Sequence, residues 1–267
     1  MGAALIKYLD RLFFQGEMAH GEKILASVMA LCPRFARHGV CGLPIAFRAM
    51  KGWNPAKSRS PLALCVWAAL ANEMTRNLDR LECLYMLLSL IEYFRPREGL
   101  SVKRKHLLAP IRGVCSWWTI MLNPQEEGSV SKAGEMDDGI VMDCQWMPWI
   151  GAVLRPLKEG NPDGYVFPFS YPSFLAKFNK AAATLNIKGL VPYQWRHSGA
   201  SIDASKRSRT ILEIQQRGRW KSFKSVARYE KHGRLATSAQ NLPRGLLETA
   251  LSCEARLEDT VTLGRCI

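Results

Sequence analysis

The sequence predicts a mainly α protein with a small antiparallel β-sheet, an α+β fold, and three observations lead to this prediction. Apolar residues recur at helical spacing over most of the chain. One central stretch is rich in β-branched and aromatic residues, which favour strands. Hydrophobic residues make up 48% and charged residues 22% of the 267 residues, so the chain has enough apolar surface to bury a core.

Helices are predicted in two parts of the N-terminal third. Residues 3–31 carry apolar side chains at helical spacing, with interruptions near Gly16 and Gly21, which indicates two short helices. Residues 51–61 contain glycine, two prolines and three cations, none of which favours a helix interior. The helical pattern returns between residues 61 and 91, for example at Leu64 and Leu84, and predicts two further helices.

The central stretch predicts two strands. Residues 114–122 are rich in β-branched and aromatic side chains, and residues 139–142 form a second short apolar run. The polar residues 123–138 are expected to connect them as a loop or hairpin, and helices are expected beyond residue 149.

These patterns divide the chain into four segments. We expect a helical domain at residues 1–55, a linker at 56–61, a larger domain at 62–235 and a C-terminal tail at 236–267. In the tail, apolar residues such as Leu247 and Leu251 suit a helix that docks on another protomer, or one that packs on its own chain.

The charge balance favours a polyanionic partner. Lys and Arg number 37 against 23 acids, a formal net charge of +14. Residues 186–235 hold twelve of the cations and three acids, interleaved with Trp, Tyr and Gly, so we expect nucleic acid to bind there; a solvated helical face is the alternative. The candidate DNA-binding residues are Lys188, Lys206, Arg207, Arg209, Arg217, Arg219, Lys221, Lys224 and Arg228.

Other classes of site find little support. The eight cysteines form no pair of CxxC motifs, so no metal site is expected from them, and we interpret the cysteines as reduced thiols. No uncharged apolar run approaches the ~18 residues that span a bilayer, so we expect an intracellular protein without a membrane partner.

Three separated segments carry residues suited to phosphate chemistry: 93–100, 193–201 and 218–230. Read together, they resemble the tyrosine recombinase family, the phage-type integrases. Arg95 and Glu98 match its R-x-x-E box, and Arg196 lies in a segment similar to its H-x-x-R-H box. Tyr229 follows Trp220 by nine residues, the interval that the family keeps between a histidine or tryptophan and its nucleophile.

The resemblance implies a fold, an activity and partners. Residues 62–235 would be the catalytic domain, and residues 1–55 would be a core-binding DNA-binding domain, shorter than a complete one. Such enzymes cut and rejoin double-stranded DNA through a 3′-phosphotyrosine intermediate without a cofactor, as tetramers on paired sites. In a eukaryotic cell the protein would act in the nucleus, and otherwise in the cytoplasm or nucleoid.

The resemblance also implies residue roles that fit the side-chain chemistry. Tyr229 would attack phosphorus, and Lys132, the best match for the hairpin lysine, would protonate the leaving 5′ oxygen. Arg95 and Arg196 suit a phosphate clamp because a guanidinium donates two parallel hydrogen bonds and stays charged. The remaining candidates support these residues. The Trp220 indole N–H would donate to a phosphate oxygen, and Glu98 would orient an arginine.

Tyr193 departs from the family pattern. It stands where the family has histidine or lysine, and a neutral hydroxyl cannot supply positive charge there, so we expect reduced activity. His197 is interpreted as a packing residue, since a helical neighbour of Arg196 points about 100° away. Two alternative functions stay open: a DNA-binding relic without turnover, and a type IB topoisomerase that relaxes supercoiled DNA.

Overall fold

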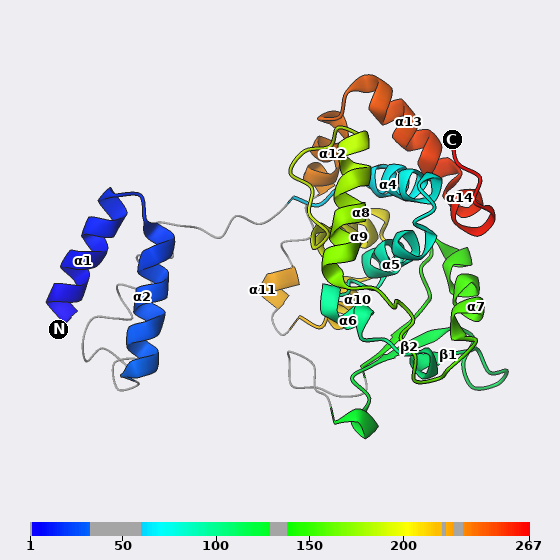
Figure 1. The fold of residues 1–267 in the computed structure, drawn as a ribbon, viewed down its shortest axis with the longest axis horizontal. Coiled ribbons are helices and arrows are strands. Elements are labelled where there is room, and N and C mark those ends of the chain that lie inside the picture. The colour runs from blue at the N-terminus through cyan, green and yellow to red at the C-terminus, as the bar shows by residue number, and fades with distance from the viewer. Residues whose placement is uncertain (1, 33–59, 129–137, 221–222, 227–231) are drawn as a thin grey trace. The chain divides into compact units, whose positions relative to one another are not determined.

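The computed structural model describes residues 2–32, 60–128, 138–220, 223–226 and 232–267 (Figure 1). The chain divides into two compact units, residues 1–58 and residues 59–267. The protein is mainly helical, 62%, with a small three-stranded antiparallel sheet, which confirms the α+β class.

The described part of the first unit, residues 2–32, contains two helices, as the apolar spacing predicts. Helix α1 (Gly2–Phe14) and helix α2 (Met18–Leu31) are separated by a turn in which Gly16 has a φ of +76°, a value that favours glycine. Leu9, Leu12 and Leu25 form the shared core. Gly21, predicted as an interruption, lies inside α2, because its backbone amide still bonds to the Glu17 carbonyl.

The second unit is built around buried helices. Helices α4 (Leu64–Arg76) and α5 (Arg80–Ile91) lie almost entirely in the core, and α8 (Tyr171–Thr184) and α9 (Gln194–Lys206) pack against them. Tyr85 of α5 makes edge contacts with four aromatic rings, so the core around it is densely aromatic. The other α-helices among the described residues of this unit are α6 (Pro96–Leu100), α7 (Leu154–Lys158), α10 (Ile211–Arg217), α11 (Phe223–Val226), α12 (His232–Gln240), α13 (Arg244–Ala255) and α14 (Leu257–Leu263).

The sheet has the order β1-β2-β3, with both neighbouring pairs antiparallel. Strands β2 (Thr119–Leu122) and β3 (Asp138–Val141) confirm the predicted pair. The prediction missed β1 (Leu107–Leu108), which is too short to show a period of two. It was also wrong for residues 114–118: Val114 and Cys115 lie in a turn closed by two hydrogen bonds between Ile111 and Cys115, and residues 116–118 follow that turn outside any strand.

The C-terminal tail packs on its own chain. Helix α13 lies against α4, and Ala250, Cys253 and Leu257 belong to the same core as α4 and α5 (Figure 1). Helix α13 therefore packs in cis through part of its apolar surface, which includes the partly buried Leu247, while Leu251 stays exposed. Docking of this helix on another protomer stays a prediction.

Among the described residues, no helix is long and apolar enough to cross a membrane. The seven cysteines of the described segments are all unpaired, and Cys65, Cys83, Cys144 and Cys253 are buried.

Candidate functional site

Arg95 and Glu98 meet at the start of helix α6. The sequence predicts both on one helix face, but Arg95 precedes the helix in an extended conformation and Pro96 occupies the first helical position. The Glu98 carboxylate accepts a hydrogen bond from the backbone N–H of Arg95 at 2.7 Å and forms an ion pair with the Arg95 guanidinium. The expected orienting contact is thus present, with capping geometry in place of a helical i,i+3 pair.

Glu98 also joins this segment to one that lies far along the chain. Its carboxylate accepts a hydrogen bond from the Arg219 guanidinium at 2.7 Å. Burial opposes ionisation of Glu98, but Arg219 and the contacts from Arg95 outweigh it and hold the pKa of Glu98 below its usual value. Glu98 therefore stays a carboxylate at neutral pH and links the two arginines.

Arg196 lies beside this pair at the start of helix α9. Its side chain is almost fully buried, and its guanidinium donates to the backbone carbonyls of Tyr93 and Gly218. The guanidinium carbon stands 4.6 Å from the centre of the Trp220 ring, a cation–π contact. Burial, with Arg219 and Arg95 nearby, lowers the pKa of Arg196 to about 10, so it is still charged at pH 7.

We call Arg95, Glu98, Arg196, Arg219 and Trp220 the arginine cluster. Three guanidinium groups stand here against a single carboxylate of the cluster. An excess of positive charge in a mostly buried place is costly unless an anion compensates it. The cluster is therefore suited to bind an anion, and its half-buried Arg95 is the member with the most exposed side chain among the three arginines.

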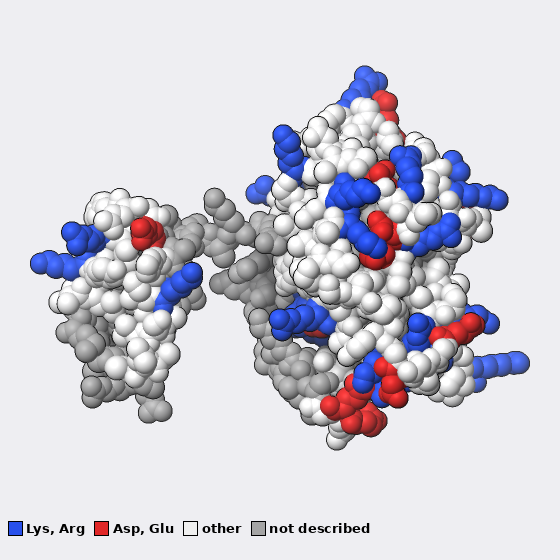
Figure 2. All heavy atoms as spheres, in the orientation of Figure 1, with Lys and Arg blue, Asp and Glu red and all other residues white. Residues whose placement is uncertain are grey.

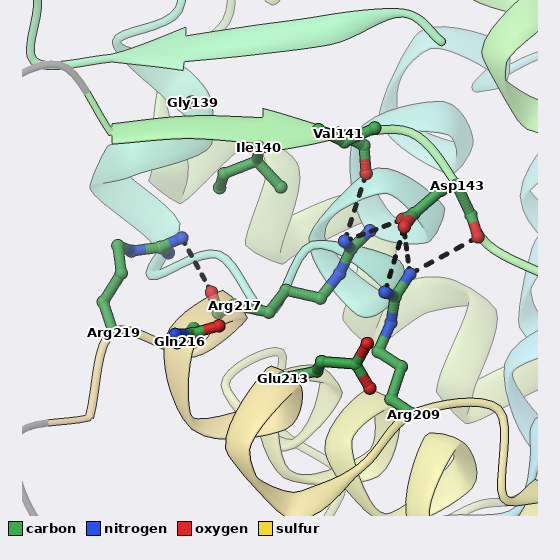
Figure 3. Close-up of a pocket in the computed structure, with 9 residues that line it drawn as sticks. All are labelled: Gly139, Ile140, Val141, Asp143, Arg209, Glu213, Gln216, Arg217 and Arg219. Carbon is green, nitrogen blue, oxygen red and sulfur yellow. Dashed lines mark hydrogen bonds and ion pairs between the residues drawn. The ribbon is translucent and has the colours of Figure 1, made fainter. Parts of the chain in front are cut away.

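Two further arginines are held in a separate ion-pair network, and Figure 3 draws the part of it around Asp143. Arg217 pairs with Glu92 at 2.7 Å and with Asp143 at 3.0 Å, and Arg209 pairs with Asp143. Both side chains are at most 10% exposed. Arg209 and Arg217 were predicted to contact DNA, but their placement favours a structural role that ties the end of β3 to the helices.

A cavity of about 280 Å³ lies beside this network, between strand β3 and helix α10 (Figure 3). Ile140 forms part of one wall, and the stems of Arg217 and Arg219 form part of the other. Arg219 of the arginine cluster lines this cavity together with residues of the ion-pair network, so the cavity lies next to both.

Glu92 is the most deeply buried acid of the network. Its carboxyl has no exposed surface, and burial raises the pKa of Glu92 to about 7 even though Arg217 and Arg209 oppose the shift. Glu92 therefore changes protonation near neutral pH.

Several predicted site residues fall outside the residues that the structure describes. These are Lys132, Lys221, Arg228 and Tyr229. Lys224 belongs to helix α11, but its side chain is not among those described. The predicted nucleophile and general acid therefore remain predictions from the sequence.

Tyr193 and His197 contact each other next to the cluster. Tyr193 immediately precedes helix α9, and its ring meets the His197 ring edge-on at 5.5 Å. Both are half-buried. The contact agrees with the interpretation of His197 as a packing residue.

Three of the candidates for DNA contact are exposed: Lys188, Lys206 and Arg207. Lys206 and Arg207 are exposed at the C-terminal end of α9, about 15 Å from Arg196 at a rise of about 1.5 Å per residue, and Lys188 is exposed after α8. Figure 2 shows cations of residues 59–267 scattered over the visible face with acids among them. On that face, the described residues form several small basic patches.

Sequence reasoning missed three residues that shape the site: Glu92, Tyr93 and Asp203. Tyr93 and Glu92 stand two and three residues before Arg95, and Asp203 is one of three acids in the basic stretch. A rare acid among many cations is the signal that would have found Asp203.

No protein-family model matches the chain, and no curated protein matches it in sequence. The functional argument therefore depends on the residues and their geometry.

Proposed function

We propose that the protein cuts and rejoins DNA strands by the chemistry of tyrosine recombinases, with Tyr229 as nucleophile and an integrase-like catalytic domain at residues 62–235. The observation that carries this proposal is the arginine cluster. Arg95, Arg196 and Trp220 come from three separate sequence segments, and Glu98 and the Trp220 ring link them in one place.

The cluster supplies what a metal-free phosphodiester cleavage needs. The transition state carries negative charge on the non-bridging oxygens, and preorganised arginines stabilise such charge. Removing one donor of this kind typically costs ~2.7–4 kcal/mol of transition-state stabilisation. In this proposal Arg95 and Arg196 hold the phosphate, and Arg219 adds positive charge that favours the phenolate of Tyr229.

The roles of Tyr229 and Lys132 extend the proposal to the chemical steps. The Tyr229 oxygen attacks phosphorus, and the bond from phosphorus to the 5′ oxygen breaks. Lys132 gives a proton to that departing oxygen. Because the phosphotyrosine keeps the energy of the broken bond, a strand end rejoins without ATP.

Double-stranded DNA is the proposed partner, and in this proposal the protein binds it as a tetramer on paired sites. The net charge of +14 supports a polyanionic partner. Of the predicted DNA-contact residues, Lys188, Lys206 and Arg207 are exposed to solvent, where they can contact a phosphate backbone.

A nicked suicide duplex tests the proposal. Cleavage next to the nick releases a short strand, so religation fails and the covalent complex accumulates. A library of such duplexes is needed because the target site is unidentified. We expect the wild-type chain to form a complex with DNA that survives denaturant, and Tyr229→Phe to form none.

Tyr165→Phe is the matched control, because Tyr165 is an exposed tyrosine outside the cluster. It should form the complex at the wild-type rate. A denaturant-stable complex with Tyr229→Phe, or none with wild type on any duplex, would contradict the proposed chemistry. Relaxation of a supercoiled plasmid without a specific site would instead favour a type IB topoisomerase.

One observation favours a second function, a DNA-binding module without turnover. Arg196 is 1% exposed, and both of its terminal nitrogens donate to backbone carbonyls. A guanidinium held in this way has fewer donors free for a phosphate. In that case, DNA would bind with steep salt dependence while no duplex gave a covalent complex.

A further inference from the structure

Tyr93 has a strained backbone next to the arginine cluster. Its φ is +51°, in the left-handed region, although it is not a glycine. A non-glycine residue in this conformation costs on the order of 1–3 kcal/mol and persists only where its surroundings hold it there. Tyr93 is fully buried, so the neighbouring side chains supply that support.

Both ends of Tyr93 are bound. Its backbone carbonyl accepts a hydrogen bond from Arg196, and its hydroxyl donates to Asp203. The ring centre lies 5.9 Å from that of Trp220 and 6.0 Å from the guanidinium carbon of Arg217. One residue therefore contacts Arg196 directly and also supports the tryptophan that stacks on it.

Asp203 anchors the hydroxyl end of Tyr93. It is 2% exposed, and its carboxylate also accepts from Trp146 at 2.7 Å, from Ser208 and from Arg209 at 3.2 Å. Four donors from separate positions fix the carboxylate, because a buried polar group with satisfied partners resists movement. Asp203 lies two helical turns after Arg196 on α9, so both are carried by one rigid element.

The position of the Tyr93 ring depends on the absence of a side chain at Gly199. A Cβ at position 199 would stand 2.8 Å from the Tyr93 ring and 1.9 Å from the Leu90 carbonyl oxygen. Helix α9 therefore approaches α5 closely enough to fix the ring from that side.

We propose that Tyr93 and Asp203 are a positioning pair that holds Arg196 and Trp220 in the arginine cluster. The inference rests on the proposed function for what the cluster does. The pair touches no reacting atom. Asp203 fixes the phenol, the phenol fixes the strained backbone of residue 93, and the carbonyl of that backbone aims the Arg196 guanidinium.

Tyr93→Phe tests the pair in the full-length chain, because it removes the hydroxyl and keeps the ring and the carbonyl. We expect covalent complex formation on the suicide duplex to slow about 10- to 100-fold, since a shift near 1 Å in a positioning group costs up to about 100-fold. The Kd for the same duplex should stay within about twofold of wild type. Asp203→Asn should show the same split between rate and affinity.

Thr260→Val is the matched control. It also removes a buried hydroxyl, one that donates to the Arg265 carbonyl at 3.1 Å in helix α14. All variants are assayed about 20 °C below their own Tm, so that lost stability does not lower the rate. If Tyr93→Phe slows the reaction no more than Thr260→Val does, the positioning role is overturned.

A second measurement does not depend on activity. In chains labelled with 5-fluorotryptophan, the 19F resonances of Trp220, Trp146 and Trp67 are assigned by Trp→Phe variants. Tyr93→Phe should shift the resonances of Trp220 and Trp146, and leave Trp67, which packs against Phe178, unmoved. A Trp220 resonance that stays in place overturns the inference. If wild type forms no covalent complex, the proposed function fails, and the Trp220 resonance alone decides whether the pair holds the cluster.

Discussion

At the scale of single residues, burial decides what each charge in the site can do. Arg196 stays charged although almost fully buried, because two carbonyls and an aromatic face replace its water. Glu98 stays ionised because the surrounding arginines outweigh burial, whereas Glu92 titrates near pH 7 because burial outweighs Arg217. Residues of the same type thus differ in protonation according to their neighbours.

Arg196→Lys is predicted to separate catalysis from DNA affinity. A lysine keeps the positive charge but loses the planar fork that donates two parallel hydrogen bonds. We expect covalent complex formation to fall about 100-fold or more and the Kd for DNA to change by less than about threefold, because many phosphate contacts share the binding energy. The two values come from denaturing gels and fluorescence anisotropy. An equal loss of both would contradict a specific role in cleavage.

Glu92 is predicted to make stability depend on pH. Folding raises the pKa of Glu92 from its ordinary value to about 7, so the folded state favours the protonated form. Its contribution is fully present below about pH 4.5 and is lost as the pH rises through about 7, at about 1.4 kcal/mol for each unit by which the folded and unfolded pKa values differ.

Urea unfolding of wild type and Glu92→Gln at pH 5 and pH 8 measures this effect. The amide cannot ionise, so the variant should be less stable than wild type at pH 5, or equal to it, and should gain relative stability at pH 8. A difference in unfolding free energy between the two proteins that does not change with pH would contradict the prediction.

At the scale of elements, close approach between helices sets the geometry of the site. Helix α9 carries both Arg196 and Asp203, and it packs on α5, whose C-terminal end leads into Tyr93 and Arg95. The sheet is tied to the same region by the ion pairs of Asp143, which follows β3. The site is therefore held where α5, α9 and α10 meet.

Gly199→Ala is predicted to disturb this contact. The added methyl group would overlap the Leu90 carbonyl and the Tyr93 ring, and overpacking of this kind costs about 1–3 kcal/mol. Thermal unfolding should show a lower Tm for this variant. Gly245→Ala is the control, since nothing lies within 4 Å of a Cβ there and alanine favours the helical conformation at this exposed position of α13. If both variants shift the Tm in the same direction, the result contradicts the packing argument.

At the scale of the whole molecule, the excess of positive charge is distributed between two uses. Part of the positive charge is neutralised within the fold, where Arg209, Arg217 and Arg219 are paired with acids. Lys188, Lys206 and Arg207 lie outside, in contact with solvent. The net charge of +14 therefore overstates the charge that a flat polyanion would meet directly.

DNA binding is predicted to weaken steeply with salt. Each neutralised phosphate contributes a slope of about −0.9 in log K against log[salt], so several contacts give a slope of several units. Lys206→Ala with Arg207→Ala should lower the slope by about two, whereas Arg217→Lys, whose charge is kept and buried, should leave it unchanged. Anisotropy titrations between 50 and 200 mM salt measure these slopes. A flat dependence for wild type would mean that the exposed cations do not contact DNA.

The sequence by itself determined several of the local elements and which side chains suit phosphate chemistry. Apolar spacing was enough to locate α1, α2, α4 and α5, and β-branched runs were enough for β2 and β3, because these signals come from neighbours along the chain. The pairing of Arg95 with Glu98 also followed from short spacing. Burial and long-range contact carry no such signal. Only the tertiary structure decided that Arg209 and Arg217 form ion pairs with acids, that the tail packs in cis and that Glu98 reaches Arg219. Those outcomes depend on which distant surfaces come together as water is excluded.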